Sequence, residues 1–174
     1  MVCTIAHSLA YLKSRNNQLS REFSGSSKVI SWIEHLEWWL RKDIEKFVFI
    51  NKLSPSAFLW HKKVVIGHQP YITAGWFPAS SKTSFLELSK AVVNHINAAG
   101  AISPNAIWIA SVHPRNKAAK QLNKRCGYAE IDEEMREIAQ KILPNMPDTY
   151  IFMAMMPSKK MSANPPTIDK TNKN

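Results

Sequence analysis

The sequence predicts an α/β fold in which a mixed central β-sheet is flanked by helices. In the second half of the chain, short apolar runs of strand length alternate with amphipathic helical patterns, an order typical of a crossover unit packed on a sheet. In the first half, several β-rich runs follow one another with short connections, which favours antiparallel neighbours and therefore a mixed sheet. The 174 residues, of which 45% are hydrophobic, suffice to bury one core without metals or disulfides.

The segment before these strands is expected to contain a short strand at Val2–Ala6 and two helices. The first helix covers residues 7–16, and a loop of glycine and serine follows at 24–27. Ser31 opens the second helix, because its hydroxyl can cap the helix while Glu34, three residues later, completes a capping box. The apolar residues of this helix fall on one face: Ile33, Leu36, Trp39 and Leu40.

The β-rich region is expected to form neighbouring antiparallel strands. Its apolar, β-branched and aromatic runs are Phe47–Ile50, Ala57–Trp60, Val64–Ile66 and Tyr71–Phe77. Lys62 and Lys63 separate two of these runs and are expected at a turn or a strand edge. A polar turn, Pro78–Thr83, then leads into the second half of the chain.

The second half is expected to alternate helices and strands. A helix over Ser84–Ala99 ends at Gly100, and its core face carries residues spaced by three and four: Phe85, Leu88, Val92 and Ile96. The elements that follow are a strand at Ala106–Val112, a helix at Lys117–Arg125 closed by Gly127, a helix at Asp132–Leu143 and a strand at Thr149–Met156. Residues 1–156 are therefore expected to form a single domain, and residues 157–174 a disordered polar tail.

The formal net charge of +10 predicts attraction to an anionic partner. Three interpretations stay open: ordinary solvated charge, attraction of a phosphate-rich cofactor, and binding of nucleic acid, which is not favoured because no lysine and arginine run forms an arm. Cys3 and Cys126 belong to no CxxC pair, so no metal site is expected. No apolar run reaches membrane-spanning length and the start does not resemble a signal peptide, so a cytoplasmic location without a membrane partner is expected.

Two segments carry a resemblance to a known family. In the first, a strand ends in valine, an asparagine follows four residues later, and a helix is closed by glycine and tyrosine: Val112, Asn116, Ala119, Leu122, Gly127 and Tyr128. The second lies near the N-terminus: Arg15-Asn16, Arg21, Ser24, Ile30-Ser31, Glu34-His35 and Trp38. Together and in this order they resemble the GNAT acetyltransferases, closest to the branch that includes sugar-nucleotide and ribosomal-protein N-acetyltransferases, over residues 7–156.

This resemblance implies acetyl-CoA as co-substrate and direct attack by an amine on its thioester, with no covalent enzyme intermediate. In this family two parallel neighbouring strands splay apart, and the pantetheine arm pairs with their open backbone groups; here these strands would be Tyr71–Phe77 and Ile107–Val112. A backbone N–H of the first strand would polarise the thioester carbonyl. The acceptor is a small molecule or a peptide, and a nucleotide-linked amino sugar, a protein N-terminus, a polyamine and a small antibiotic all stay open. The oligomeric state also stays open, with a dimer among the expected states.

The residues that the resemblance assigns to the coenzyme lie on the first strand, the loop after it and the later helix: Ala74, Gly75, Trp76, Ser80, Ser81, Lys82, Thr83, Ser84, Asn116, Ala119 and Asn123. The loop 80–84 would hold the pyrophosphate at the start of a helix, with hydroxyl and ammonium donors where the family has glycines. Asn123 stands where many members carry the tyrosine that protonates the leaving thiolate.

Acetylation of an amine needs a base that removes its proton. His68, which precedes the first splayed strand, is the first candidate, His113 at the end of the other strand is the second, and His35 is the third. Five tryptophans either line the acceptor pocket or belong to the core: Trp32, Trp38, Trp39, Trp60 and Trp76. Two rival functions stay open, a non-catalytic binding protein of GNAT shape and a protein associated with nucleic acid.

Overall fold

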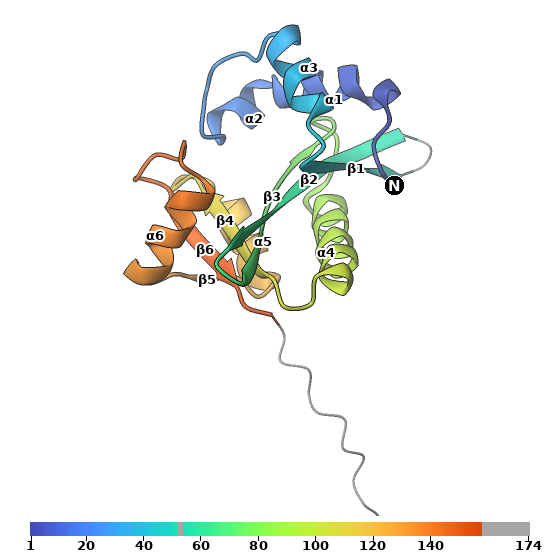
Figure 1. The fold of residues 1–174 in the computed structure, drawn as a ribbon. Coiled ribbons are helices and arrows are strands. Elements are labelled where there is room, and N and C mark those ends of the chain that lie inside the picture. Colours follow the sequence, from blue (N-terminus) through green and yellow to red (C-terminus); the bar gives the residue numbers. More distant parts are fainter. Residues whose placement is uncertain (52–53, 158–174) are drawn as a thin grey trace, which may run out of the picture.

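The computed structural model describes residues 1–51 and 54–157 (Figure 1). The elements in chain order are a 3-10 turn Ile5–His7, α1 Ser8–Arg15, α2 Gln18–Glu22, α3 Trp32–Leu40, β1 Ile44–Asn51, β2 Ser54–Ile66, β3 Gln69–Pro78, α4 Phe85–Ile102, β4 Ile107–Val112, α5 Lys117–Arg125, β5 Ala129–Glu130, α6 Glu133–Ile142 and β6 Ile151–Met155. The expected tail lies, apart from Pro157, outside the described residues, and the assignment of residues 1–156 to a single domain stays a prediction.

The strands form one six-stranded sheet in the order β1-β2-β3-β4-β6-β5. The pair β3–β4 is parallel, while β1–β2, β2–β3, β4–β6 and β5–β6 are antiparallel. The chain enters β4 from β3 through the long helix α4, which is the crossover connection that a parallel pair requires. The expected mixed sheet is therefore confirmed.

Helices cover both faces of this sheet, and successive residues of a strand alternate between them. Along β2, Leu59 packs with Leu88 and Val92 of α4 on one face, while Phe58 packs with Tyr11 of α1 and Trp39 of α3 on the other. The helix α5 joins the α4 face, and α6 covers the second face beside β4 and β6. Figure 1 shows the N-terminal helices gathered over one end of the sheet.

Two expected strand features are wrong. Residues 2–6 form no strand, because only Val2 makes a β-bridge, to Phe47, before the 3-10 turn begins. Lys62 and Lys63 lie inside the continuous strand β2, where both pair with β3 and Lys62 also pairs with β1. The lysine stems extend to solvent from the strand, so two charges in sequence do not break it.

Two expected helix features also differ. The helix α4 continues through Gly100 to Ile102, because one glycine in a helix costs only about 1 kcal/mol relative to alanine. In α3 the capping box of Ser31 and Glu34 is present, but Ile33 and Leu40 are exposed. Trp39 is buried as expected, but the other buried residue of this helix is His35, so the buried face is rotated from the predicted apolar one. Phe85 of α4 is likewise exposed, whereas Leu88 and Val92 are buried as expected.

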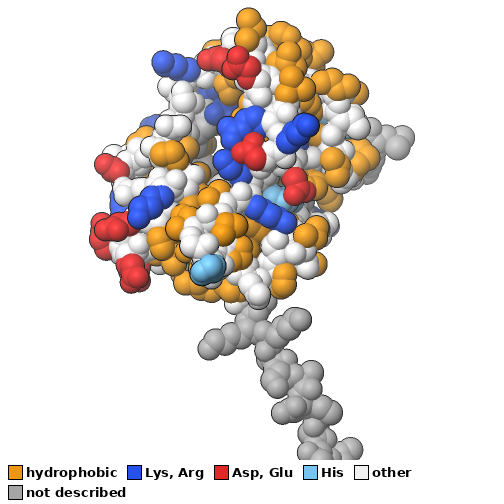
Figure 2. Space-filling view, viewed as in Figure 1, with side chains coloured by type: hydrophobic (Ala, Val, Ile, Leu, Met, Phe, Trp, Pro, Cys, Tyr) orange, Lys and Arg blue, Asp and Glu red, His pale blue; other side chains and the backbone are white. Residues whose placement is uncertain are grey.

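The basic residues do not gather into one patch on the face shown in Figure 2. Lysine and arginine side chains there are interspersed with acidic and apolar ones. Some are paired, as where Asp43 contacts both Arg41 and Lys62 and where Glu130 contacts Lys120. In the described part of the chain, no helix is both long and apolar enough to cross a membrane.

Candidate functional site

The parallel pair β3–β4 opens part-way along its length. The two strands are in register at Tyr71–Ile107, Ile72–Trp108 and Thr73–Ile109, and no further pair follows. Beyond that point β3 stays paired with β2 as far as Pro78, while β4 stays paired with β6 as far as Val112. Their facing edges therefore separate, which leaves backbone N–H and C=O groups that a ligand can satisfy.

A cavity of about 410 Å³ occupies this opening. Its walls are the separated strand ends, the start of α5, and the segments that close over them from α1, α2 and the loop before β6. Of the residues expected at the coenzyme, Ala74, Gly75, Trp76, Asn116, Ala119 and Asn123 line this cavity. Most of the other lining side chains are apolar, which is typical of a pocket with a few orienting polar groups.

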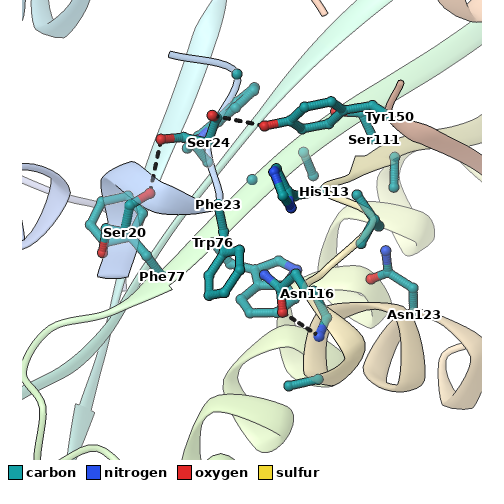
Figure 3. A pocket seen from close by; sticks show the side chains of 18 of the residues that line it. Ser20, Phe23, Ser24, Trp76, Phe77, Ser111, His113, Asn116, Asn123 and Tyr150 are labelled. Atoms are coloured by element: carbon teal, nitrogen blue, oxygen red, sulfur yellow. Dashed lines mark hydrogen bonds between the residues drawn. The ribbon is translucent and has the colours of Figure 1, made fainter. Parts of the chain in front are cut away.

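Asn116 lies where β4 passes into α5 and caps that helix. Its Oδ1 accepts a hydrogen bond from the backbone N–H of Ala119 at 3.0 Å (Figure 3), so its amide Nδ2 remains to donate to a ligand. One helical face below it carries Ala119 and Asn123, both buried. Among the hydrogen bonds found between described residues, none uses the Asn123 side chain, although it lines the cavity.

His113 extends from the end of β4 into the cavity. Its Nδ1 accepts a hydrogen bond from the backbone N–H of Arg115 at 3.2 Å. Because Nδ1 is the acceptor, the neutral ring carries its proton on Nε2, which is then a donor. The rings of Phe23 and Tyr150 meet it edge-on, with centroids 5.7 and 5.3 Å away. This geometry suits His113 to donate a hydrogen bond and does not suit it to act as a base.

The cavity is closed above by a contact between two distant segments. The Tyr150 hydroxyl donates to the backbone carbonyl of Ser24 at 2.8 Å, and the Ser24 hydroxyl donates to the carbonyl of Ser20 (Figure 3). Gly25 packs so closely on Met146 that a Cβ would stand 2.5 Å from its Cε atom. Burial raises the pKa of Tyr150, so the hydroxyl remains a donor.

Gly75 and Trp60 form one wall of the cavity. They are directly opposite each other in the β2–β3 ladder, and the indole of Trp60 crosses the position where a Cβ of residue 75 would stand. Glycine is therefore required for this tryptophan to lie across β3. Of the tryptophans weighed for the pocket, Trp60 and Trp76 line the cavity, whereas Trp39 is buried against Tyr11.

Arg15, at the end of α1, also lines the cavity and was not among the expected site residues. Its Nη1 atom is buried and has no hydrogen-bond partner among the described residues. A signal was present in the sequence, because Tyr11 and Arg15 are four residues apart and share one face of the helix. Because Tyr11 is a core residue, an arginine on its face of the helix is expected to be at least partly buried.

The loop expected to hold the pyrophosphate lies to one side of this cavity. Ser80, Lys82 and Thr83 line a separate, smaller hollow of about 140 Å³, and Ser81 is exposed. Ser84 caps α4, and the Glu87 carboxylate accepts a hydrogen bond from the Ser84 backbone N–H at 2.9 Å. An acidic side chain thus already lies at the start of α4, where the helix dipole favours a negative charge.

Two of the three histidines expected as bases lie away from the cavity. His68 is exposed in the turn between β2 and β3, at the opposite end of β3 from the opening. His35 is buried in α3, where its Nε2 lies 2.9 Å from the Ser8 hydroxyl and 3.1 Å from the Ser8 carbonyl. Burial lowers the pKa of His35, which is consistent with a neutral structural residue.

No family model and no curated protein matches this chain. Solved structures do match. AAC(6')-Ib in complex with ribostamycin and coenzyme A superposes with a TM-score of 0.70 at 10% identity, over 90% of this chain and 91% of that one. The ribosomal-protein-alanine N-acetyltransferase of Brucella melitensis gives 0.66 at 14% identity, over 90% and 98%. The GNAT domain of PAT from S. lividans gives 0.65 at 12% identity, over 90% and 88%.

This chain has the GNAT fold. The fold class expected from the strand, asparagine and helix pattern around residues 108–128 is therefore confirmed by both topology and superposition. In the GNAT fold of this chain, the separated strands are β3 and β4, and the helix that follows β4 is α5.

Proposed function

We propose that this chain is an N-acetyltransferase that uses acetyl-CoA. The observation that carries the proposal is the separation of β3 and β4 beyond Thr73 and Ile109, which opens directly onto the cavity. The solved structures of AAC(6')-Ib with coenzyme A and with acetyl-CoA support it, because that protein has the same fold and binds this coenzyme.

The pantetheine arm would lie between the separated strands. Its amides would pair with the open backbone groups of Ala74–Phe77, as an additional strand pairs with a sheet edge. Asn116 would donate its Nδ2 hydrogen to an amide carbonyl of the arm, since its Oδ1 is already engaged by the cap. Ala119 has no side chain beyond Cβ and would leave room beside the pantetheine arm. The Asn123 amide would contact the sulfur end of that arm.

The pyrophosphate would lie near the start of α4, with Lys82 as its cation and the hydroxyls of Ser80 and Thr83 beside it. The Thr83 hydroxyl already donates to the Ser56 carbonyl at 2.7 Å, so backbone N–H groups of the loop would contribute more than this side chain. The Glu87 carboxylate opposes the phosphate charge at this place, and its removal should favour the coenzyme.

The neutral amine would attack the thioester carbonyl carbon directly. A nitrogen–carbon bond forms, the carbon–sulfur bond breaks, coenzyme A leaves as a thiolate, and the amine proton passes to water. A backbone N–H of β3 would stabilise the oxyanion. His113, with its proton on Nε2, would donate a second hydrogen bond to the oxyanion or the thiolate, as a neutral imidazole can do without ionising.

Transfer can be followed as release of free thiol from acetyl-CoA in the presence of a panel of primary amines. The assay buffer contains no added thiol. The proposal predicts that free thiol is released when the amine is present and is not released when the amine is left out. Binding of acetyl-CoA without transfer to any amine would favour the non-catalytic binding protein instead. Tight, salt-dependent binding to nucleic acid without coenzyme binding would favour a protein associated with nucleic acid.

A further inference from the structure

The part of the cavity under α1 and α2 carries an uncompensated positive charge. The residues that close it are Arg15, Leu19, Ser20, Phe23, Met146 and Tyr150. Among the described residues that line the whole cavity there is no aspartate or glutamate, and Arg15 carries its one permanent charge. A cationic ligand in this space would meet a like charge and no carboxylate.

Arg15 lacks the partner that a buried guanidinium normally has. No ion pair found among residues 1–51 and 54–157 involves it, and its buried Nη1 has no hydrogen-bond partner there. Burial lowers the pKa of Arg15, yet arginine remains protonated in proteins. Because a charge held away from water without a partner destabilises a protein, this arrangement costs stability until an anion is present.

The neighbouring charged groups are engaged elsewhere. Arg21 of α2 donates to the backbone carbonyls of Asn16 and Ser27, so it adds positive charge near Arg15 without neutralising it. Glu22, on the same short helix, pairs with Arg115 at 3.3 Å instead. The fold thus keeps the nearest acidic side chain of α2 in a different ion pair.

The position of Arg15 relates it to the acceptor amine. Arg15 and Tyr150 both line this part of the cavity, and the ring of Tyr150 lies 5.3 Å from that of His113. Arg15 therefore lies on the side of the cavity formed by α1, α2 and the loop before β6, and His113, at the end of β4, meets this side through the rings of Phe23 and Tyr150. Asn116, which the proposed function assigns to the coenzyme, lies on a different segment, at the start of α5.

We infer that Arg15 binds an anionic group, a carboxylate or a phosphate, on the acceptor, so that the acceptor is an acidic amine. This inference rests on the proposed acetyltransferase function. A guanidinium forms two parallel hydrogen bonds with either oxyanion, and both bonds are strong because both groups are charged. A polyamine such as an aminoglycoside would bring further positive charges beside Arg15, so the acceptor class differs from that of AAC(6')-Ib, which is solved with ribostamycin and kanamycin.

The test compares matched amines that differ in one anionic group. The probes are β-alanine and β-alaninamide for a carboxylate, O-phosphoethanolamine and ethanolamine for a phosphate, and spermidine as a polycation. The proteins are wild type, Arg15→Gln and the control Arg125→Gln, which makes the same charge change at an exposed position of α5. The readout is kcat/KM from thiol release, together with the Kd for coenzyme A.

The inference predicts that wild type prefers one anionic probe to its neutral partner and to spermidine. Arg15→Gln should lower kcat/KM for that probe by about 10- to 100-fold, the usual worth of hydrogen bonds to a charged group, and change the neutral probe by less than about threefold. Arg125→Gln should change neither. The affinity for coenzyme A should be the same in all three proteins, and a loss in Arg15→Gln would assign Arg15 to the coenzyme and overturn the inference.

A binding arm separates failure of the inference from failure of the proposed function. The same probes are titrated by saturation-transfer NMR into each protein, with and without saturating coenzyme A. If coenzyme A does not bind, the proposed function fails, while Arg15-dependent binding of an anionic probe still supports the anion site. If coenzyme A binds and the probes bind equally to wild type and Arg15→Gln, the acceptor inference is wrong.

Discussion

Replacing Gly75 with alanine should move the Trp60 indole and obstruct the cavity. A Cβ at residue 75 would stand 2.6 and 2.7 Å from the Cε2 and Cζ2 atoms of Trp60, well inside any real contact. Gly75 does not have a positive φ, so alanine costs nothing in backbone conformation, and the whole effect comes from this overlap. The indole cannot yield freely, because Trp38 packs edge-on against it with ring centroids 6.2 Å apart.

Overpacking of this kind destabilises a protein by about 1–3 kcal/mol. Gly75→Ala should therefore lower the free energy of unfolding in urea by that amount, and should raise the Kd for acetyl-CoA because the displaced ring narrows the space between β3 and β4. The matched control is Gly100→Ala in α4, where nothing lies within 4 Å of the new Cβ. That variant should gain up to about 1 kcal/mol and bind the coenzyme as wild type does.

Wild-type stability and wild-type coenzyme affinity in Gly75→Ala would refute this reasoning. If Gly75→Ala lowers the free energy of unfolding but leaves the Kd for acetyl-CoA unchanged, the predicted overlap with Trp60 is supported. In that case Gly75 and Trp60 do not form a wall of the coenzyme site.

Three further predictions concern single side chains. The pKa of His95 is lowered by burial to about 4, and His61, which contacts it at 2.8 Å, is shifted in the same direction. The unfolded chain binds these protons near pH 6.5, so the free energy of unfolding should fall as the pH drops from about 7 to 4, by roughly 3 kcal/mol for His95 alone, and His95→Gln should flatten the dependence in urea titrations. Glu87→Gln should tighten acetyl-CoA binding at low ionic strength by about threefold if the pyrophosphate lies at the start of α4, and an unchanged Kd would place it elsewhere. His113→Asn should lower kcat and leave the shape of the pH–rate profile unchanged, because the proposal gives His113 a hydrogen bond to donate and not a proton to accept; loss of the acidic limb of that profile would restore His113 as the base.

The elements with strong local signals could be predicted from the sequence. The helix Lys117–Arg125 has the bounds expected, because Asn116 caps its start and Gly127, at φ +93°, permits the turn that ends it. The capping box at Ser31 was equally local. Features that depend on the partner strand were less accessible. Lys62 lies inside a strand because β1 and β3 pair with it on both sides, and the residues adjacent to Lys62 in the sequence do not show this pairing.

The site was predicted in part for a related reason. Val112 and Asn116 mark the end of a strand in sequence, so the residues near them lie in the cavity. His68 is also adjacent to a strand in sequence, but at the end where β3 and β4 are still paired, and sequence alone does not say at which end parallel strands separate. Arg15 lay within the resemblance, yet its lack of a partner is visible only when the helices α1 and α2 are folded over the cavity.

The measurement that tests the central claim most directly is calorimetric titration of acetyl-CoA into wild type and Asn116→Ser, with ATP as a polyanion control. Serine keeps a capping hydroxyl for α5 but lacks the amide donor, so the helix is retained while the contact to the coenzyme is lost. The account predicts that acetyl-CoA binds and ATP does not, and that Asn116→Ser weakens acetyl-CoA binding by about 3- to 10-fold. Equal binding of acetyl-CoA and ATP, or no binding of either, would contradict the claim that the opening between β3 and β4 is a coenzyme A site.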